Sequence, residues 1–398
     1  MANENLGAAR KAKNDEFYTQ FHDIEKEINA YLDYNPDVFR NKTVLLPCDD
    51  PEWSNFTKYF AQNFETLGLA KLISTSYAPN SKPKLLDLQP TLFELESPNY
   101  DESKAANNGK IFTLHRDTNG DRVLNVEDLE WEYLEGDGDF RSLEITALRD
   151  QADVIITNPP FSLFREFLSW IFEADKQFVM IGNMNAIGYK EVFALIKQDK
   201  LWLGATANNS DLVFRVPKGF EVAPSDREKA ARMGYVGDFT RLGNACWFTN
   251  LDHGRRHQVL PLMTQQENIK FSKHKDIRGV GYRVYDNYDA IDVSYTDAIP
   301  SDFDGVMGVP ISFLDKYNPE QFEILSLTQT WSDMPTKKYG PQVLVDPSGR
   351  RKIVGALNSS TAIKVDKPPV GESYYELDGQ YYISTYKRLL IRRRKPKP

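Results

Sequence analysis

Cysteine is scarce in this sequence: Cys48 and Cys246 are the two cysteines among 398 residues. Two are too few for a disulfide framework or for a zinc site built on cysteine. Long apolar runs are missing too, since no stretch approaches the ~20 apolar residues that cross a bilayer. Residues 1–13 are polar and rich in Ala and Lys, without the apolar segment of a secretory signal. We therefore expect a cytoplasmic protein with no membrane span and no resident metal ion.

The sequence also lacks an excess of positive charge. It has 49 Lys and Arg residues against 57 Asp and Glu residues, which gives a formal net charge of −8. That balance excludes a protein coated with positive charge. It leaves room for a local basic cleft, because electrostatic steering depends on where the charges lie. Basic residues gather in the second half of the chain, at 255–257, 270–283, 350–352 and 387–395.

The length of the chain is sufficient for two domains. In its first part, apolar runs alternate with amphipathic segments. Strands are expected at 42–47, 70–76, 153–157 and 178–181, and helices at 14–33, 52–66 and 163–172. This alternation predicts an α/β fold with a mostly parallel sheet and with ligands at the carboxyl ends of its strands. Beyond about residue 205 the strands become shorter, so we expect one domain over 1–205 and another over 206–398.

Residues 80–135 do not fit the alternation of strands and helices and are predicted to be an insertion. Within it, the runs 111–116 and 122–126 flank Asn119-Gly120, a turn dipeptide of two-residue β-hairpins. The neighbouring Asp117 and Asp121 suggest a calcium loop as an alternative. A hairpin is preferred, because the glycine stands at position 4 of that loop, whereas an EF-hand requires it at position 6.

The tetrapeptide Asn158–Phe161 carries the strongest chemical signal. It follows the apolar run Asp153–Thr157, which places a stiff elbow at the carboxyl edge of the predicted sheet. Pro159 and Pro160 have no N–H donor, so the polar groups left at this edge are mainly acceptors. Two carbonyl acceptors and the Phe161 ring suit a flat heterocycle that carries an exocyclic NH₂ group. The alternative is a plain turn that ends a strand, since Asn-Pro is common in turns.

Three further segments fit a single cofactor. Residues 14–19 are expected to begin a helix, whose positive end can receive a carboxylate. The acidic turn at 49–51 ends the first strand and can pair with a cation, while Asp139-Phe140 offers an acceptor and a ring to an adenine. S-adenosylmethionine combines an amino acid end, a sulfonium and an adenine. The predicted cofactor-binding residues are Asn14, Glu16, Phe17, Tyr18, Thr19, Asp49, Asp50, Pro51, Asp139 and Phe140.

Taken in order along the chain, these motifs resemble those of the EcoRI-type adenine-specific DNA methyltransferases. The resemblance covers most of the chain, including 14–19, 44–56, 138–140, 158–161, 243–248, 277–282, 308–310 and 317–325. It implies a Rossmann-like S-adenosylmethionine-dependent methyltransferase sheet followed by an α+β DNA-recognition region. It also implies transfer of a methyl group from S-adenosylmethionine to N6 of adenine in double-stranded DNA.

The resemblance assigns roles to particular residues. Asn158, Pro159, Pro160 and Phe161 become the catalytic residues, which would grip an adenine flipped out of the duplex. The Asn158 side-chain carbonyl and the Pro159 main-chain carbonyl would accept hydrogen bonds from its amine, without a covalent enzyme intermediate. The basic segments of the second half become DNA contacts, through Arg255, Arg256, Lys273, Lys275 and Arg278.

The chain departs from most methyltransferases at three points. The first strand ends in Asp49-Asp50-Pro51 rather than in a glycine-rich loop, and Gln20 stands where related motifs often have proline. The second strand, which ends near Ser76, has no obvious acid for ribose hydroxyls. Methyl transfer to cytosine N4 or to a protein glutamine remains an alternative, as does an inactive DNA-binding protein. We expect a monomer without a stable protein partner, and a cognate restriction endonuclease is left open.

Overall fold

The structure is a computed structural model that describes residues 18–51, 54–78, 97–206, 212–216 and 222–395. The chain divides into two compact units, one of residues 1–186 and 201–254 and the other of residues 187–200 and 255–398. We expected a boundary near residue 205. The first unit instead continues to Gly254, because strand β11 (Ala245–Thr249) pairs with β7 (Gln177–Asn183) in its main sheet.

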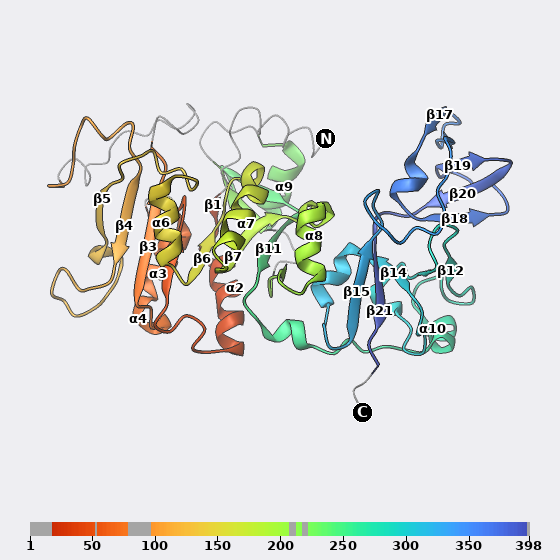
Figure 1. The fold of residues 1–398 in the computed structure, drawn as a ribbon, viewed down its shortest axis with the longest axis horizontal. Helices are drawn as coiled ribbons and strands as arrows, with labels where there is room; N and C mark the ends of the chain where they lie inside the picture. Colours follow the sequence, from red (N-terminus) through yellow and green to blue (C-terminus); the bar gives the residue numbers. More distant parts are fainter. Residues whose placement is uncertain (1–17, 52–53, 79–96, 207–211, 217–221, 396–398) are drawn as a thin grey trace. The chain divides into compact units, whose positions relative to one another are not determined.

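The first unit is built on an eight-stranded mixed sheet with the order β5-β4-β3-β2-β6-β7-β11-β8 (Figure 1). Its central strands are parallel, and they are β3 (Lys71–Ser76), β2 (Thr43–Leu46), β6 (Val154–Thr157) and β7. The outer strands pair antiparallel, and they are β4 (Lys110–Leu114), β5 (Glu130–Tyr133), β8 (Trp202–Leu203) and β11. The expected parallel strands are confirmed, and their carboxyl ends share one edge of the sheet.

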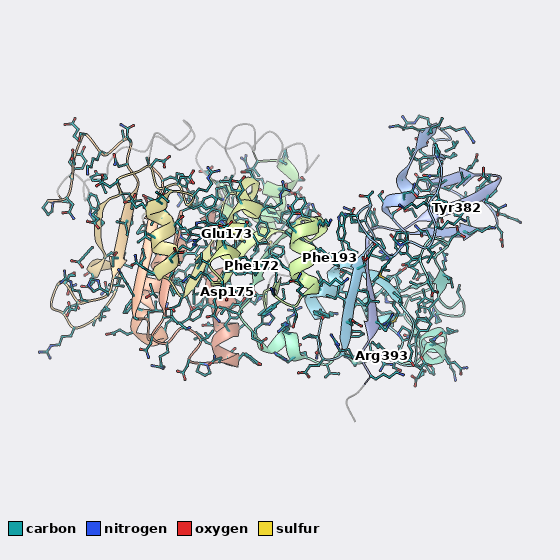
Figure 2. All side chains as sticks on the ribbon, in the orientation of Figure 1. Phe172, Glu173, Asp175, Phe193, Tyr382 and Arg393 are labelled. Atoms are coloured by element: carbon teal, nitrogen blue, oxygen red, sulfur yellow. The ribbon has the colours of Figure 1, made fainter. Side chains whose placement is uncertain are left out.

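Amphipathic helices pack against this sheet. The helices of the first unit are α2 (Phe21–Tyr34), α3 (Asn55–Gln62), α4 (Phe64–Leu67), α6 (Leu143–Gln151), α7 (Phe164–Glu173) and α9 (Pro224–Arg232). Ile24 and Ile28 of α2 are fully buried in one cluster with Val44 of β2. Phe172 of α7, labelled in Figure 2, meets Phe178 of β7 edge-on at 5.7 Å between ring centroids. Burial of these apolar faces fixes the sheet edge from which the site is built.

The first helix begins later than predicted. α2 starts at Phe21, whereas Tyr18–Thr19 form strand β1. This strand pairs antiparallel with β9 (Leu212–Arg215), which also pairs with β10 (Phe239–Leu242). The predicted helix end is therefore wrong for Tyr18 and Thr19, because a strand far along the chain imposes an extended backbone there. The rest of the predicted motif, residues 14–17, lies outside the described residues.

The predicted two-residue hairpin is also wrong. β4 pairs with β5, so the second strand is Glu130–Tyr133 rather than 122–126. Gly120 lies in the connection between them, where the Asp117 carboxylate accepts the amides of Gly120 at 2.6 Å and of Arg122 at 2.9 Å. Hydrogen bonds to a side-chain carboxylate, rather than to a paired strand, thus satisfy backbone amides of this loop. Part of the predicted insertion thus forms an edge of the main sheet.

The second unit contains two five-stranded, mainly antiparallel sheets, with the orders β12-β13-β14-β21-β15 and β17-β16-β19-β20-β18. Their strands are β12 (Arg283–Val284), β13 (Ile291–Asp292), β14 (Met307–Pro310), β15 (Phe322–Leu327), β16 (Gln342–Val345), β17 (Arg351–Val354), β18 (Ala362–Val365), β19 (Tyr374–Leu377), β20 (Gln380–Ser384) and β21 (Arg388–Arg393). Helices α8 (Lys190–Lys197) and α10 (Gln265–Phe271) accompany them. Across the described part of the chain, no helix has the length and apolar character to span a membrane.

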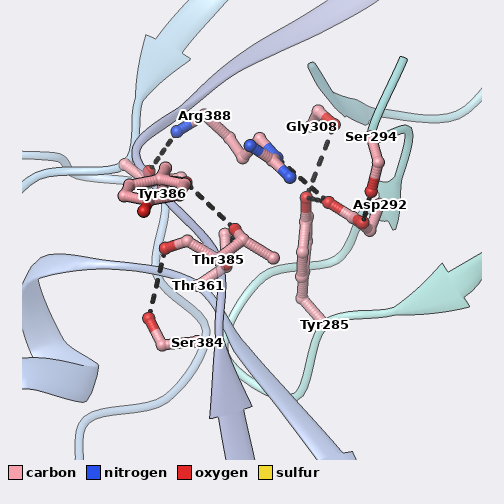
Figure 3. Close-up of polar contacts among 10 residues, drawn as sticks. Tyr285, Asp292, Ser294, Gly308, Thr361, Ser384, Thr385, Tyr386 and Arg388 are labelled. Atoms are coloured by element: carbon pink, nitrogen blue, oxygen red, sulfur yellow. Dashed lines mark hydrogen bonds and ion pairs between the residues drawn. The ribbon is translucent and has the colours of Figure 1, made fainter. Parts of the chain in front are cut away.

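A buried polar cluster joins strands of the first of these sheets (Figure 3). The Asp292 carboxylate accepts hydrogen bonds from the Tyr285 hydroxyl at 2.5 Å, from Arg388 Nε at 3.1 Å and from the Ser294 hydroxyl at 2.6 Å. Burial, together with the charge of Asp292, raises the pKa of Tyr285. Gly308 is required here, because a Cβ at that position would lie 2.3 Å from the Tyr285 hydroxyl. The charges of Asp292 and Arg388 compensate each other within the cluster, which holds β13, β14 and β21 together.

Candidate active site

The elbow after β6 lies at the carboxyl edge of the central parallel strands. Every residue of β6 is buried, whereas Asn158 is half-buried. Pro159 is buried, and Pro160 precedes a short 3-10 helix over Phe161–Leu163. The chain thus turns from a buried strand toward α7 and leaves Asn158 at a partly open edge.

The side chain of Asn158 contacts the N-terminal motif. Its Nδ2 donates to Thr19 Oγ1 at 3.3 Å, although the two residues are 139 positions apart. Thr19 is buried, and its main-chain carbonyl accepts from Asn55 Nδ2 at 2.7 Å. This contact orients the amide with its nitrogen toward Thr19. The structure therefore brings Thr19, from the predicted segment at 14–19, together with Asn158 of the elbow.

Phe161 borders the main hydrophobic core. The ring is half-buried and meets the fully buried Phe214 edge-on at 6.4 Å between centroids. Phe214 lies in β9 directly opposite Thr19 of β1. One strand therefore supports both the ring of the elbow and the partner of Asn158. Stacking of a base on Phe161 stays a prediction.

Asp49 links the ends of several elements. Its two carboxylate oxygens accept from Ser54 Oγ at 2.7 Å and from Thr157 Oγ1 at 2.8 Å. Its main-chain carbonyl accepts from Thr57 Oγ1 at 2.5 Å and also from Ser74 Oγ. Asp49 is only 4% exposed. The carboxylate therefore holds β2, β6 and the start of α3 in place, and a contact with a cationic ligand stays a prediction.

The turn around Asp49 contains a left-handed residue. Cys48 has a φ of 68°, in the region that favours glycine. A non-glycine residue in this conformation costs on the order of 1–3 kcal/mol, and it persists only where the surrounding structure enforces it. Here the hydrogen bonds of the neighbouring Asp49 enforce it. The turn that lacks a glycine-rich sequence is thus shaped by hydrogen bonds. Asp50 and Pro51 follow in it half-buried, and the Asp50 carbonyl accepts the Ser54 amide at 2.7 Å.

Asp139 reaches the end of β3 from the loop that follows β5. Gly138, at a φ of 86°, packs so closely that a Cβ would lie 2.3 Å from the Ser76 carbonyl oxygen. Arg141 donates twice to Asp139, from Nη2 at 2.6 Å and from Nε at 2.9 Å, and once to Glu166 of α7 at 2.9 Å. The hydrogen bonds from Arg141 hold the pKa of Asp139 below its usual range. Asp139 is therefore an ionised acceptor at neutral pH.

Phe140 does not present its ring to a ligand. The ring is fully buried, stacks on Phe167 at 3.9 Å between centroids and meets Trp170 edge-on at 5.6 Å. The predicted contact between this ring and an adenine is therefore wrong, because the side chain belongs to the core under α7. Phe140 instead anchors the loop that carries Asp139.

Sequence reasoning missed Tyr77 and Arg141. Tyr77 directly follows β3, where no acid for ribose hydroxyls had been found. Burial, followed by the proximity of Cys48 and Asp139, raises the pKa of Tyr77. Its hydroxyl is therefore neutral at physiological pH and can donate or accept a hydrogen bond. A polar residue immediately after the second parallel strand was the signal that could have identified it.

The described part of the chain has no cluster of metal ligands, and the thiol of Cys246 is buried. Among the described residues, no group of three or more His, Cys, Asp or Glu side chains is placed to hold a metal ion. Cys246 is fully buried in β11, and this burial raises the pKa of its thiol. Thiolates rather than thiols are nucleophiles, so Cys246 is structural.

Two of the five predicted DNA contacts form ion pairs, within the second unit, in which one of the two side chains is buried. Arg256 is buried and pairs with Asp199. Arg255 pairs with the buried carboxylate of Asp315 and donates to its main-chain carbonyl at 3.0 Å. The burial of Arg256 contradicts its predicted contact with DNA, and the bonds of Arg255 give it a structural role too. Charge runs in sequence do not reveal such buried partners.

The remaining three predicted DNA contacts lie on the surface that follows α10. Lys275 and Arg278 are exposed. The Lys273 side chain is 75% exposed, although its Nζ pairs with Asp297 at 2.7 Å. These three side chains are therefore accessible to a polyanion.

Comparison with known proteins places the chain among methyltransferases. A family model described as adenine-specific methyltransferase EcoRI matches residues 5–394. The chain is 43% identical over 324 residues to type II methyltransferase M.EcoRI of Escherichia coli, a match that covers 81% of this chain and 89% of that protein. It is 33% identical over 349 residues to type II methyltransferase M.MpnI of Mycoplasma pneumoniae, covering 87% and 93% respectively. No solved structure matches the chain.

The family is thereby established: the chain belongs to the EcoRI family of adenine-specific methyltransferases. It is an adenine-specific DNA methyltransferase of the type II restriction–modification class.

Proposed function

We propose that the enzyme transfers the methyl group of S-adenosylmethionine to N6 of an adenine flipped out of double-stranded DNA. The placement of Asn158 carries this proposal. Its amide is oriented by Thr19 at 3.3 Å, at the carboxyl edge of the parallel strands, and Phe161 follows three residues later. Carbonyl acceptors and an aromatic ring at such an edge suit an aromatic amine.

The groups around this edge fit S-adenosylmethionine. Asp49 and Asp50 place negative charge after β2, which suits an ammonium or a sulfonium. Asp139 is an acceptor for an adenine amine, and Tyr77 offers a hydroxyl to ribose. The cofactor, when bound, supplies an electrophilic methyl group on sulfur. We infer a Rossmann-like methyltransferase sheet for the parallel strands, with a site that also includes Tyr18, Thr19 and Pro51 and, outside the described residues, Asn14, Glu16 and Phe17.

The residues of the elbow activate the adenine amine, whose lone pair is delocalised into the ring. Asn158 Oδ1 and the Pro159 carbonyl accept hydrogen bonds from its two N–H groups, which favours a pyramidal nitrogen with an available lone pair. Pro160 stiffens this rim. Stacking on Phe161, at ~1–3 kcal/mol per base, offsets part of the few kcal/mol that flipping requires. Alignment of the amine by these groups lowers the barrier to attack.

The second unit supplies the proposed DNA contacts. Lys273, Lys275 and Arg278 are exposed cations, which position a protein on phosphates without reading sequence. The first unit holds the cofactor and the catalytic elbow. We expect the enzyme to act in the cytoplasm as a monomer, and a cognate restriction endonuclease would be a separate protein.

Expression in a host that lacks N6-methyladenine, followed by mapping of modified bases in the host DNA, tests this function. The wild-type enzyme should mark adenines within one recognition sequence, and Asn158→Ala should leave most of these adenines unmethylated. Asn119→Ala, in an exposed loop of the same unit, is the matched control and should behave as wild type. Modification of cytosine instead of adenine would contradict the proposal. Full methylation by Asn158→Ala would remove the role given to the elbow.

A further inference from the structure

A surface turn of the second unit combines an exposed apolar side chain with a fixed backbone. This segment, Ile277–Tyr282, connects α10 to β12 and is called the 277–282 turn. Ile277 is buried, whereas Val280 is 67% exposed. Gly279 and Gly281 flank Val280 at φ values of 77° and 95°. Val280 therefore stands at the apex of the turn between two residues that have no side chain.

Hydrogen bonds hold this apex in place. The Gly279 amide donates to the Ile269 carbonyl of α10 at 2.8 Å. The amides of Val280 and Gly281 both donate to the Ile277 carbonyl, at 3.1 Å and 2.9 Å. A turn that is fixed before binding loses little conformational entropy on contact with a partner. The 277–282 turn thus presents Val280 in a pre-organised way.

Gly279 leaves the backbone on one side of Val280 uncovered. A Cβ added at Gly279 would meet no atom within 4 Å, so packing within the protein does not exclude a side chain there. Positive φ explains why glycine suits the position. Gly279 is exposed, so a ligand can approach the main chain closely on that side of Val280, whereas Gly281 is buried against Ile269.

Charge around the turn favours a polyanionic partner. Residues 265–284 contain five Lys or Arg residues and two acidic residues, within a chain whose net charge is −8. Lys275, Arg278 and Arg283 are exposed in this segment. A single apolar side chain surrounded by cations matches the major groove of duplex DNA, where the apolar methyl groups of thymines lie between two rows of phosphates.

We propose that the 277–282 turn enters the major groove of the substrate DNA, where Val280 contacts the 5-methyl group of a thymine. Arg278 and Lys275 then lie against phosphates on the sides of the groove. This inference rests on the proposed function, because it requires duplex DNA as the substrate. The thymine methyl group is the apolar mark of a base edge, and it faces the major groove. Val280 would therefore be a specificity-determining residue of the enzyme, while the neighbouring cations add affinity.

The test uses the full-length enzyme after its recognition sequence has been mapped. Val280→Ala is compared with Val370→Ala, since Val370 is also exposed in the second unit and precedes a left-handed glycine, Gly371 at a φ of 78°. Each thymine of the site is replaced in turn by uracil, which lacks only the methyl group. Dissociation constants are measured by fluorescence anisotropy, and thermal unfolding verifies that both variants are folded.

At one thymine, uracil should weaken binding by the wild type and by Val370→Ala about fourfold, the value of one buried methyl group. Val280→Ala should be insensitive to that replacement. It should also bind the thymine-containing site roughly fourfold to tenfold more weakly than the wild type, with unchanged affinity for a scrambled duplex. Uracil effects that are the same in all three proteins would overturn the inference. An equal loss of affinity on the scrambled duplex would overturn it as well.

Arg278→Gln tests the phosphate contact separately. It should reduce the slope of log affinity against log salt concentration by about one on both duplexes, and an unchanged slope would overturn that part. Failure of the proposed function has a different signature, because the wild-type enzyme itself would then leave no N6-methyladenine. If the wild type methylates normally but Val280→Ala binds every duplex as the wild type does, the role proposed for the 277–282 turn is wrong and the proposed function still holds.

Discussion

The two units each contain a polar cluster that joins strands, and the clusters differ in how completely they are buried. In the second unit, Asp292 and Arg388 are buried, and Tyr285 closes the cluster from a third segment. In the first unit, Thr19 is buried, but its partner Asn158 is half-buried. The cluster of the second unit is closed, and the cluster of the first unit is partly open.

This difference separates stability from chemistry. Groups that pair only with one another stabilise the fold, because a buried polar group without its partner is costly. A group that is oriented by a buried partner while it remains half-buried is positioned for a ligand. Asp292 is a group that stabilises the fold, whereas Asn158 is a group positioned for a ligand. Substitutions in the two clusters should therefore affect different measurements.

The largest effect is expected from Asp292→Ala. Loss of this carboxylate leaves Arg388 buried without its charged partner, which should lower the free energy of unfolding by about 3–5 kcal/mol. Urea denaturation measures this loss. Asp304→Ala is the matched control, because Asp304 pairs with Lys395 and the two side chains are 75% and 84% exposed. It should leave stability nearly unchanged, and equal losses in the two variants would show that burial of the pair is unimportant.

Asn158→Ala should lower kcat by on the order of 10²–10³-fold, the cost of removing one group that stabilises the reacting centre. Stability and the dissociation constant for DNA should change little, since Asn158 is only half-buried. Single-turnover methylation with a labelled methyl donor measures the rate. Asn158→Asp keeps a carbonyl-type acceptor and should retain more activity than the alanine variant. The reverse order would contradict the acceptor role.

Thr19→Val keeps the shape of the side chain but removes the hydroxyl that accepts from Asn158 Nδ2. A typical hydrogen bond contributes about 1 kcal/mol, so the methylation rate should fall roughly fivefold. The KM for DNA should not move, because Thr19 acts through the orientation of Asn158. Thr19→Ser should restore the rate. A Thr19→Val enzyme with normal kcat would show that this contact does not position the amide.

The smallest effect is expected in the loss of protein stability at acid pH that follows protonation of Asp139. Arg141 lowers the folded-state pKa of this carboxyl, below the value of about 3.9 that is usual for an unfolded chain. The stabilisation is therefore complete above a pH of about 4 and is lost as the pH falls through the lowered pKa. Urea midpoints of the wild type should decline more between about pH 5 and pH 2 than those of Arg141→Met. The difference should be small, since both side chains are partly exposed, and parallel declines would contradict it.

Local sequence signals predicted the centre of the main sheet well. The strands at β2, β3, β6 and β7 are short apolar runs, and burial on both faces makes such runs recognisable in the sequence. The same signals failed for Tyr18 and Thr19. Their extended conformation depends on β9, and no local pattern announces a partner so far along the chain.

Charge patterns were the least reliable guide. Arg255 and Arg256 belong to a basic run that suggested contact with phosphates, yet Asp315 and Asp199 bind them. Phe140 likewise suggested a surface for an adenine, but its ring is buried on Phe167. Whether a charged or aromatic side chain faces solvent depends on elements that are distant in sequence.

The sequence alone determined the chemical type of the site, because the Asn-Pro-Pro-Phe elbow needs only an adjacent strand to present acceptors and a ring. The tertiary structure decided which groups orient that elbow and which groups only stabilise the fold. It joined Thr19 to Asn158 and Arg141 to Asp139, and it closed the cluster around Asp292. The physical reason is range: proline and strand preferences act on neighbouring residues, whereas burial and hydrogen bonding are settled only when distant segments pack.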